Sequence, residues 1–325
     1  MSKVRGVSWD RTRSTGPCRY QAYGLTIEIP FACADLAPAD ALASVDVVVE
    51  DGVVAASLSS PVHSEPHFDI APGSFLSRGG ARAGRFLVDG ADRVVFEPNP
   101  DADDLMLAVQ FTADVLPAIL RQRGLLVLHA NAVLADGTAV LVGGAPGAGK
   151  STTLAALLVR GCKMLSDDVT ALQLGDGGTI EVLPGVARMH LTNASATAVG
   201  VDLAALRGQR WRRDKAAVPT ESSMATAPAP IGSLYVLSSR RGGAVSRSEL
   251  AGAAKFDALL GCVYGPVLSK DHPALFLSLS ALLEQVAVFD LRRPSERWSV
   301  GEVVDCIVPA GSPPRRSDNW IRGSC

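Results

Sequence analysis

The sequence predicts an α/β protein in which a small, mostly β N-terminal domain precedes a larger domain that carries a glycine-rich loop. Three observations support this organisation. Residues 1–100 contain short stretches of β-forming residues, residues 101–308 mix helical and strand-like patterns, and a glycine-rich loop joins a strand to a helix in the second region. Residues 309–325 are rich in proline and arginine, which predicts a disordered tail.

Length and composition exclude several classes of protein. The chain has 325 residues, 47% of them hydrophobic, and a formal charge of −2, so it offers no global attraction to nucleic acid or to an anionic membrane. It contains no run of 18 apolar residues, and no apolar segment follows its basic start, so we expect neither a membrane span nor a secretory signal. Scattered cysteines without CxxC spacing favour reduced thiols in a cytoplasmic protein.

The first hundred residues predict short strands separated by turns. The segments YGLTIEIPF, VDVVVEDGVVAAS, RFLVDG and RVVFEP are rich in β-formers and have Gly, Asp, Asn or Pro at their ends. From Asp101 to Gly124 the pattern changes to acidic residues at the front, apolar residues at helical intervals and arginines before a glycine. This pattern predicts an amphipathic helix, bent at Pro117, which we expect to begin the second domain.

The sequence of the second domain predicts alternating strands and helices. LLVLHANAVLADGTAVLVGGA is typical of two strands joined by a turn at Ala135 to Gly137, and the second strand runs into the glycine-rich loop. A helix should follow to near Gly161, then the short buried strand KMLSDD and the strand VTALQL. Beyond residue 180, IEVLPGVARMHL and SLYVLSS are strand-like, whereas KFDALLGCVYG and PALFLSLSALLEQVAVFDL are mainly helical, the latter ending in a strand.

The glycine-rich loop matches the P-loop pattern GxxxxGK[ST] in full. Its glycines let the backbone fold tightly with N–H groups pointing inward, and the helix that follows directs its positive end at the same anion. Lys150 supplies a charge for the β- and γ-phosphates, and the Ser151 hydroxyl is a ligand for Mg²⁺. We therefore expect a nucleotide to be bound by Gly144, Ala145, Pro146, Gly147, Ala148, Gly149, Lys150, Ser151 and Thr152.

Two adjacent carboxylates follow the P-loop closely. Asp167 and Asp168 come 16 residues after Ser151, at the end of the next strand. Adjacent residues on a strand point to opposite sides, so one carboxylate can reach a metal while the other accepts a proton from an attacking hydroxyl. An Asp-Asp turn at a strand end is the alternative interpretation, which the neighbouring P-loop disfavours.

His129 lies on the strand before the P-loop strand. A histidine in an apolar strand is often a packed core residue, and that interpretation stays open from the residues alone. If the two strands pair as a hairpin, His129 lies near the phosphates or a metal instead.

The run LLVLHANAVLADGTAVLVGGAPGAGKSTTLAALLVRGCKMLSDDVTAL resembles the catalytic domain of the HPr kinase/phosphorylase family. The shared order is a His-containing strand, a turn, a P-loop, a helix ending in Arg-Gly and a strand ending in Asp-Asp. ATP-dependent phosphoenolpyruvate carboxykinase has a similar core, but its substrate region is not found here. In layout the chain is most similar to the HPr-kinase-like proteins of lasso-peptide biosynthesis clusters, which are described as precursor peptide serine kinases.

This resemblance implies a fold and cofactors. The fold is an α/β P-loop kinase core of the HPr kinase and phosphoenolpyruvate carboxykinase type, behind a small, mostly β N-terminal domain. ATP would be held by the P-loop, and Mg²⁺ by Ser151 and Asp168. Asp167 would be the general base, although the sequence does not fix this division between the two carboxylates. His129 would organise the metal or the phosphoryl acceptor.

Arg188 falls where the family has Glu-Ile-Arg-Gly. The arginine matches, but Ala187 and Met189 flank it, so the acidic residue of the motif has no counterpart in this sequence. This departure puts the family's phosphorylase activity, and any second metal ligand at this segment, in doubt. Arg188 stays among the expected catalytic residues with Asp167, His129 and Lys150.

The resulting hypothesis is a kinase that transfers the γ-phosphoryl group of Mg·ATP to a serine of a peptide or protein. The C-terminal Ser of a lasso-peptide precursor is the implied acceptor, and HPr is the alternative. An ATPase or nucleotide switch without an acceptor, or a binding module that has lost its chemistry, are the competing classes. The preference for ATP over GTP and any homo-oligomeric state stay open.

A basic segment, RGQRWRRDK, lies at Arg207 to Lys215. It could bind an acidic peptide, a terminal carboxylate or phosphates. A solvated charged loop is the alternative interpretation. The segment is too isolated for a nucleic-acid partner to be expected in a chain of this net charge.

Overall fold

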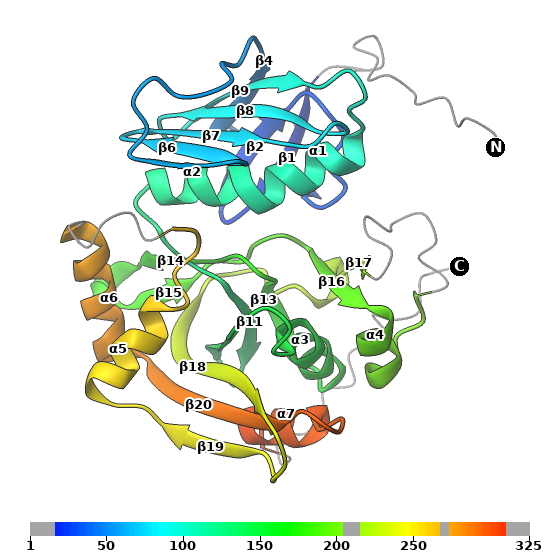
Figure 1. Ribbon diagram of the computed structural model, residues 1–325, viewed down its shortest axis with the longest axis vertical. Coiled ribbons are helices and arrows are strands. Elements are labelled where there is room, and N and C mark those ends of the chain that lie inside the picture. The colour runs from blue at the N-terminus through cyan, green and yellow to red at the C-terminus, as the bar shows by residue number, and fades with distance from the viewer. Residues whose placement is uncertain (1–16, 204–214, 267–272, 310–325) are drawn as a thin grey trace. The chain divides into compact units, whose positions relative to one another are not determined.

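The computed structural model describes residues 17–203, 215–266 and 273–309. The chain divides into two compact units, one ending at Leu125 and the other beginning at Leu126 (Figure 1). Mixed sheets with helices agree with the predicted α/β class. The predicted tail from residue 310 onward lies outside the described residues, as does the basic segment except for Lys215.

The first unit is built on a nine-stranded sheet of order β3-β1-β2-β4-β9-β8-β7-β6-β5. Strand β4 runs parallel to both of its neighbours, and the other pairs are antiparallel. The strands are β1 (Cys18–Ala22), β2 (Leu25–Ile29), β3 (Ala37–Pro38), β4 (Val47–Asp51), β5 (His63–Glu65), β6 (Phe68–Ala71), β7 (Ser74–Arg78), β8 (Gly84–Asp89) and β9 (Arg93–Pro98).

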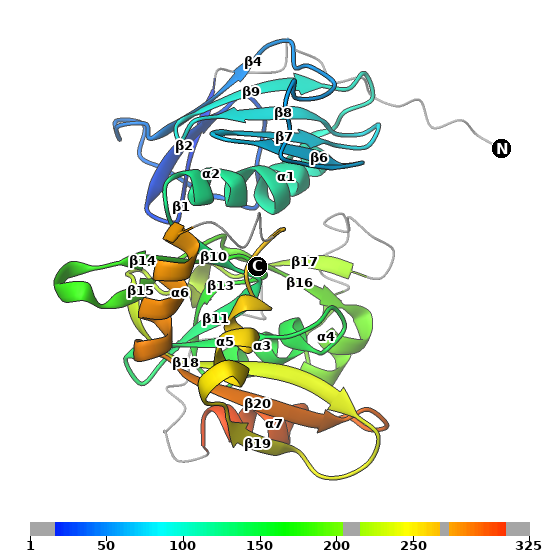
Figure 2. The ribbon, with the colours of Figure 1, turned by 60° about the vertical axis from the view of Figure 1, so that its left-hand side comes forward.

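The helical segment after this sheet belongs to the first unit. It consists of α1 (Asp104–Gln110), the π-helical turn η2 (Phe111–Val115) and α2 (Leu116–Gln122), and it lies along one face of the sheet (Figure 2). The Phe111 ring packs 6.2 Å from that of Phe86 on β8, centroid to centroid. The expectation that this helix begins the second domain is therefore wrong, because its apolar face is buried against the first sheet.

A π-helical turn lies directly before Pro117, where the sequence predicts a bend. The backbone N–H of Leu116 donates to the carbonyl of Phe111, five residues back, instead of four. Pro117 follows directly and has no N–H to donate, so the widened turn lies where the regular hydrogen-bond ladder is interrupted.

The second unit is built on a nine-stranded mixed sheet whose main path is β10-β14-β15-β18-β12-β11-β13. Strand β20 pairs with β18 and β19. The strands are β10 (Leu126–Leu128), β11 (Ala130–Ala135), β12 (Thr138–Gly143), β13 (Lys163–Ser166), β14 (Thr170–Leu174), β15 (Ile180–Val182), β18 (Ala229–Arg240), β19 (Ser246–Glu249) and β20 (Ala287–Pro294). A separate two-stranded ribbon is formed by β16 (Arg188–Thr192) and β17 (Lys215–Pro219).

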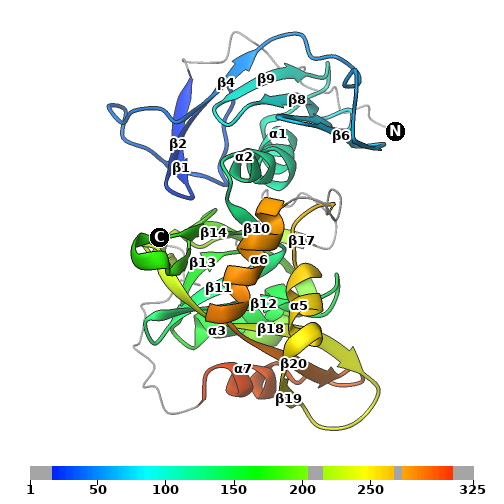
Figure 3. The same cartoon turned by 90° about the vertical axis from the view of Figure 1, so that its left-hand side faces the viewer.

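Helices cover both faces of this sheet (Figure 3). On β12, Val140 and Val142 join a core with α3, α4 and α7, whereas Ala139 and Leu141 join a core with α5 and α6. This alternation is the period of two that a buried strand requires. The helices are α3 (Lys150–Val159), α4 (Asn193–Val199), α5 (Gly252–Leu260), α6 (Pro273–Gln285) and α7 (Val300–Ile307). Within the described ranges, no helix has the length and apolarity that a membrane crossing requires.

We predict that Gln110→Met destabilises the first unit. The buried Gln110 amide donates to Ser77 Oγ (2.8 Å) and to the Gly84 carbonyl (3.0 Å), and its oxygen accepts from the Gly84 N–H (3.1 Å). Losing these buried bonds should cost about 1–3 kcal/mol. Hydrogen exchange should accelerate in β7 and β8 but not in β12 or β18.

Gln21→Met, a change at an exposed position, is the control and should change stability by less than about 0.5 kcal/mol. Unchanged hydrogen exchange in Gln110→Met would refute the stabilising role of the Gln110 hydrogen bonds.

Candidate active site

Strand register gathers the predicted site residues at one edge of the second sheet. Strand β11 is antiparallel to both β12 and β13, with Ala130 opposite Gly143 and Ala132 opposite Ser166. The residue before β11 and the residues that follow β12 and β13 therefore emerge at the same edge. These residues are His129, Gly144 and Asp167.

The P-loop connects β12 to α3 as the sequence predicts. Gly144, Gly147 and Gly149 have φ values of 134°, 81° and 112°, all in the region that favours glycine. A Cβ atom on Gly144 would lie 2.3 Å from the Leu237 carbonyl oxygen of β18, so this position excludes a side chain as well. Helix α3 begins at Lys150, directly after the loop.

Lys150 is almost fully buried beneath this loop. Its Nζ donates to the Gly144 carbonyl at 2.8 Å, and burial lowers the pKa of its ammonium group, an effect that the nearby Asp168 charge opposes. Ser151 follows it in α3 and is partly buried. The Thr152 hydroxyl, which we expected at the nucleotide, instead lies 2.7 Å from Ser195 Oγ and links α3 to α4.

The two carboxylates lie beyond the strand rather than on it. Strand β13 ends at Ser166, and Asp168 has a φ of +61°, in the left-handed region that asparagine and aspartate tolerate in turns. The expectation that the two side chains point to opposite sides is therefore wrong. One oxygen of Asp167, one of Asp168 and a ring nitrogen of His190 all lie within 4.8 Å of one another.

Asp167 is buried with one oxygen unused. Its Oδ2 accepts a hydrogen bond from the His190 backbone N–H at 2.9 Å, but Oδ1 has no hydrogen-bond partner among the described residues. Burial, and then the adjacent Asp168 charge, raise the pKa of Asp167 well above its usual value. A buried carboxylate of this kind is a strong proton acceptor when it is ionised.

His129 holds the turn that carries Asp168. Its Nδ1 lies 3.1 Å from the Asp168 carbonyl oxygen, which can only accept, so Nδ1 carries the proton. Burial, followed by the charge of Lys150, lowers the pKa of His129, which favours the neutral ring. The Asp168 N–H donates in turn to Asn131 Oδ1 at 3.1 Å. His129 is thus placed at the site rather than in the apolar core.

The ribbon β16–β17 contributes residues from a more distant part of the chain. Met189 and Leu191 are fully buried in the core against α3, so the alternating residues Arg188 and His190 face the other way. Arg188 itself is buried, and the structure therefore places it on the face that carries His190. Sequence reasoning missed His190, although its i+2 spacing from Arg188 was a usable signal.

Lys215 is a second residue whose place was not foreseen. It begins β17 opposite Thr192, and its positive charge opposes the rise in the pKa of Asp167 and adds to the fall in the pKa of His129 and Lys150, for which burial is the main cause. The predicted basic segment therefore brings its last residue within electrostatic reach of the site. The remainder of that segment lies outside the described residues.

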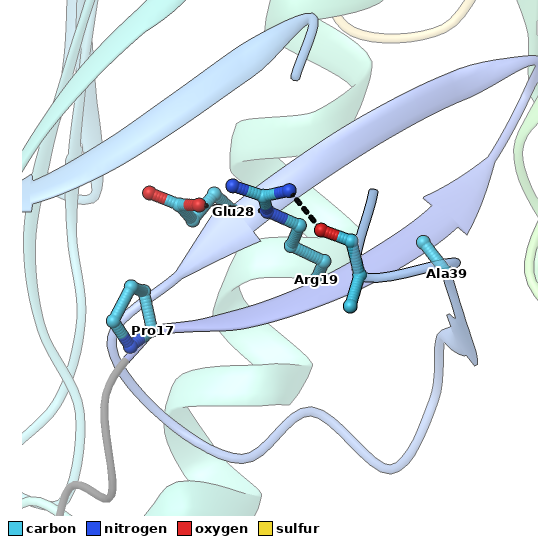
Figure 4. A pocket seen from close by; sticks show the side chains of 5 residues that line it. Pro17, Arg19, Glu28 and Ala39 are labelled. Carbon is cyan, nitrogen blue, oxygen red and sulfur yellow. Dashed lines mark hydrogen bonds and ion pairs between the residues drawn. The ribbon is translucent and has the colours of Figure 1, made fainter. Parts of the chain in front are cut away.

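A small hollow in the first unit has no comparable chemistry (Figure 4). It is lined by Pro17, Arg19, Glu28, Ala39 and Ala41, with a volume of about 290 Å³. The Arg19 guanidinium is already bound by Glu28 at 2.9 Å and by the backbone carbonyls of Ala41 and Ala43. These groups satisfy one another, so the hollow offers no recognisable ligand site.

Comparisons with known proteins add little to this geometry. No protein-family model and no curated protein matches the chain. Among solved structures it is similar to the HPr(Ser) kinase/phosphatase from Coxiella burnetii, with 16% identity and a TM-score of 0.24 over 49% of this chain and 88% of that chain. A TM-score of this size is too low to carry conclusions, so the function proposed below rests on the site itself.

We predict that Asp167→Asn stabilises the metal-free protein increasingly as the pH rises. Both folded and unfolded Asp167 are protonated below about pH 4, whereas above the raised folded pKa the native state must hold a buried charge. Asparagine removes that cost, which is about 1.4 kcal/mol for each unit of displacement of the pKa.

Thermal unfolding of both proteins in EDTA between pH 4 and 9 measures this difference. The difference in stability between Asp167→Asn and the wild type should widen as the pH rises. The same difference for Asp257→Asn, a change at an exposed position of α5, should stay constant. A gap that stays constant or narrows with rising pH would contradict the assignment.

Proposed function

We propose that the protein is an ATP- and Mg²⁺-dependent kinase that transfers a γ-phosphoryl group to a serine of a peptide or protein. The observation that carries this proposal is the position of Asp167. A buried carboxylate with an unused oxygen lies at the same sheet edge as a P-loop, which is the arrangement needed to deprotonate a hydroxyl beside a bound polyphosphate.

The P-loop residues suit the nucleotide. Three glycines with positive φ, a buried lysine and the start of α3 together provide backbone donors and positive charge for phosphates. The oxygen donors Ser151 and Asp168 suit Mg²⁺, which prefers hard oxygen ligands and would neutralise charge on the phosphates. Burial around Lys150 and Asp167 keeps the local dielectric low, so these charges act strongly on one another.

Asp167 is the residue that would take the proton from the acceptor hydroxyl. The raised pKa of this carboxyl makes its ionised form a stronger base than an exposed aspartate, and Oδ1 is available to receive the proton. His129 and Asn131 hold the neighbouring turn, so Asp168 stays beside Asp167. Catalysis would then come from positioning and charge neutralisation, as phosphoryl transfer requires.

The acceptor is best matched by a peptide with a nearby anionic group. Lys215 is a positively charged residue of the ribbon whose charge acts on Asp167, and a terminal carboxylate next to the acceptor serine would complement it. This favours the C-terminal Ser of a lasso-peptide precursor as the proposed substrate, with HPr as the alternative.

A transfer assay with γ-labelled ATP tests the proposal. With Mg²⁺ and candidate acceptors (precursor peptides ending in Ser, or HPr), label should move to one serine. Asp167→Asn should lower the rate about 10²- to 10⁴-fold, the usual contribution of a general base. Lys150→Met should abolish transfer, whereas Lys255→Met on α5 should not. Equal hydrolysis of ATP with and without acceptors would instead establish an ATPase or switch.

A further inference from the structure

A cluster of three potential metal ligands joins two separate elements of the second unit. The carboxylates of Asp167 and Asp168 come from the turn after β13, and the imidazole of His190 comes from β16. One ligand atom from each lies within 4.8 Å of the other two, which is close enough for a single ion to contact all three.

Asp167 supplies an independent sign of a missing ligand. Its side chain is more than nine-tenths buried, yet Oδ1 has no hydrogen-bond partner among the described residues. An unsatisfied carboxylate oxygen in the interior is costly, and it is costlier beside a second carboxylate. A cation at this position would compensate both the unsatisfied oxygen of Asp167 and the repulsion between the two carboxylates.

The backbone holds the three groups in place. The Asp168 carbonyl and N–H are bound by His129 and Asn131, and the His190 N–H is bound by Asp167 Oδ2. Because Met189 and Leu191 anchor the opposite face of β16 in the core, His190 is fixed toward the carboxylates. The ligands are therefore arranged before any ion binds.

We propose that Asp167, Asp168 and His190 bind a divalent transition-metal ion of the Mn²⁺ or Zn²⁺ class. Two carboxylate oxygens and one imidazole nitrogen suit such ions, whereas Mg²⁺ favours oxygen ligands alone. The site shares both carboxylates with the proposed kinase chemistry, and an ion on Asp167 Oδ1 excludes a proton there, so the metal site belongs to the protein without nucleotide or acceptor. Metal binding therefore stands or fails separately from phosphoryl transfer.

Nucleotide-free full-length protein is titrated with Mn²⁺, and free Mn²⁺ is followed by electron paramagnetic resonance. We expect one bound ion, and His190→Gln should weaken its binding at least about tenfold. His63→Gln, on β5 of the first unit, is the matched control and should bind as the wild type. In competition experiments, His190→Gln should weaken the binding of Mg²⁺ far less than the binding of Mn²⁺.

Electron spin echo envelope modulation of bound Mn²⁺ tests the nitrogen ligand in the unaltered protein, so the outcome does not depend on a variant folding. A ¹⁴N coupling from imidazole should be present, should vanish in His190→Gln and should persist in His129→Gln. No coupling in the wild type, or its loss in His129→Gln alone, would overturn the proposal. In either case, label transfer with Mg·ATP would still report on the kinase independently.

Discussion

The antiparallel pairing of β11 with both β12 and β13 is the constraint on which the site depends. This register brings the end of the P-loop strand, the end of the carboxylate strand and His129 to one edge of the sheet. A slip of one residue would send Val140 and Val142 to the wrong face and the site residues with them. Packing of the two cores on opposite faces of β12 therefore also fixes the geometry of the site.

The same edge concentrates charge where solvent cannot screen it. Asp167 and Lys150 are both buried, and burial displaces their pKa values in opposite directions, up for the acid and down for the ammonium. Each group is therefore closer to its neutral form than it would be in water, which costs native stability. Such an arrangement is unfavourable in the empty protein, and the proposed phosphate and cation would supply the missing charges.

Local patterns predicted much of the second unit, and non-local pairing accounts for the errors. The Asp136–Gly137 turn, with positive φ at both residues, and the loop glycines are encoded within a few residues, so the hairpin and the P-loop could be placed from sequence. The left-handed conformation of Asp168 could not be predicted in this way, because the Asp168 N–H donates to Asn131, 37 residues away. The helix after residue 101 was assigned to the wrong unit, since its amphipathic pattern does not say which sheet it covers.

The ribbon β16–β17 shows why His190 escaped sequence reasoning although its neighbour Arg188 did not. Its role follows only from the burial of Met189 and Leu191 against α3, which fixes which face of β16 is turned toward the carboxylates. One strand thus fills the core with alternate residues and supplies site residues with the others. Because the two faces are linked by the same backbone, a core change at Met189 should displace His190 relative to the carboxylates before the fold is lost.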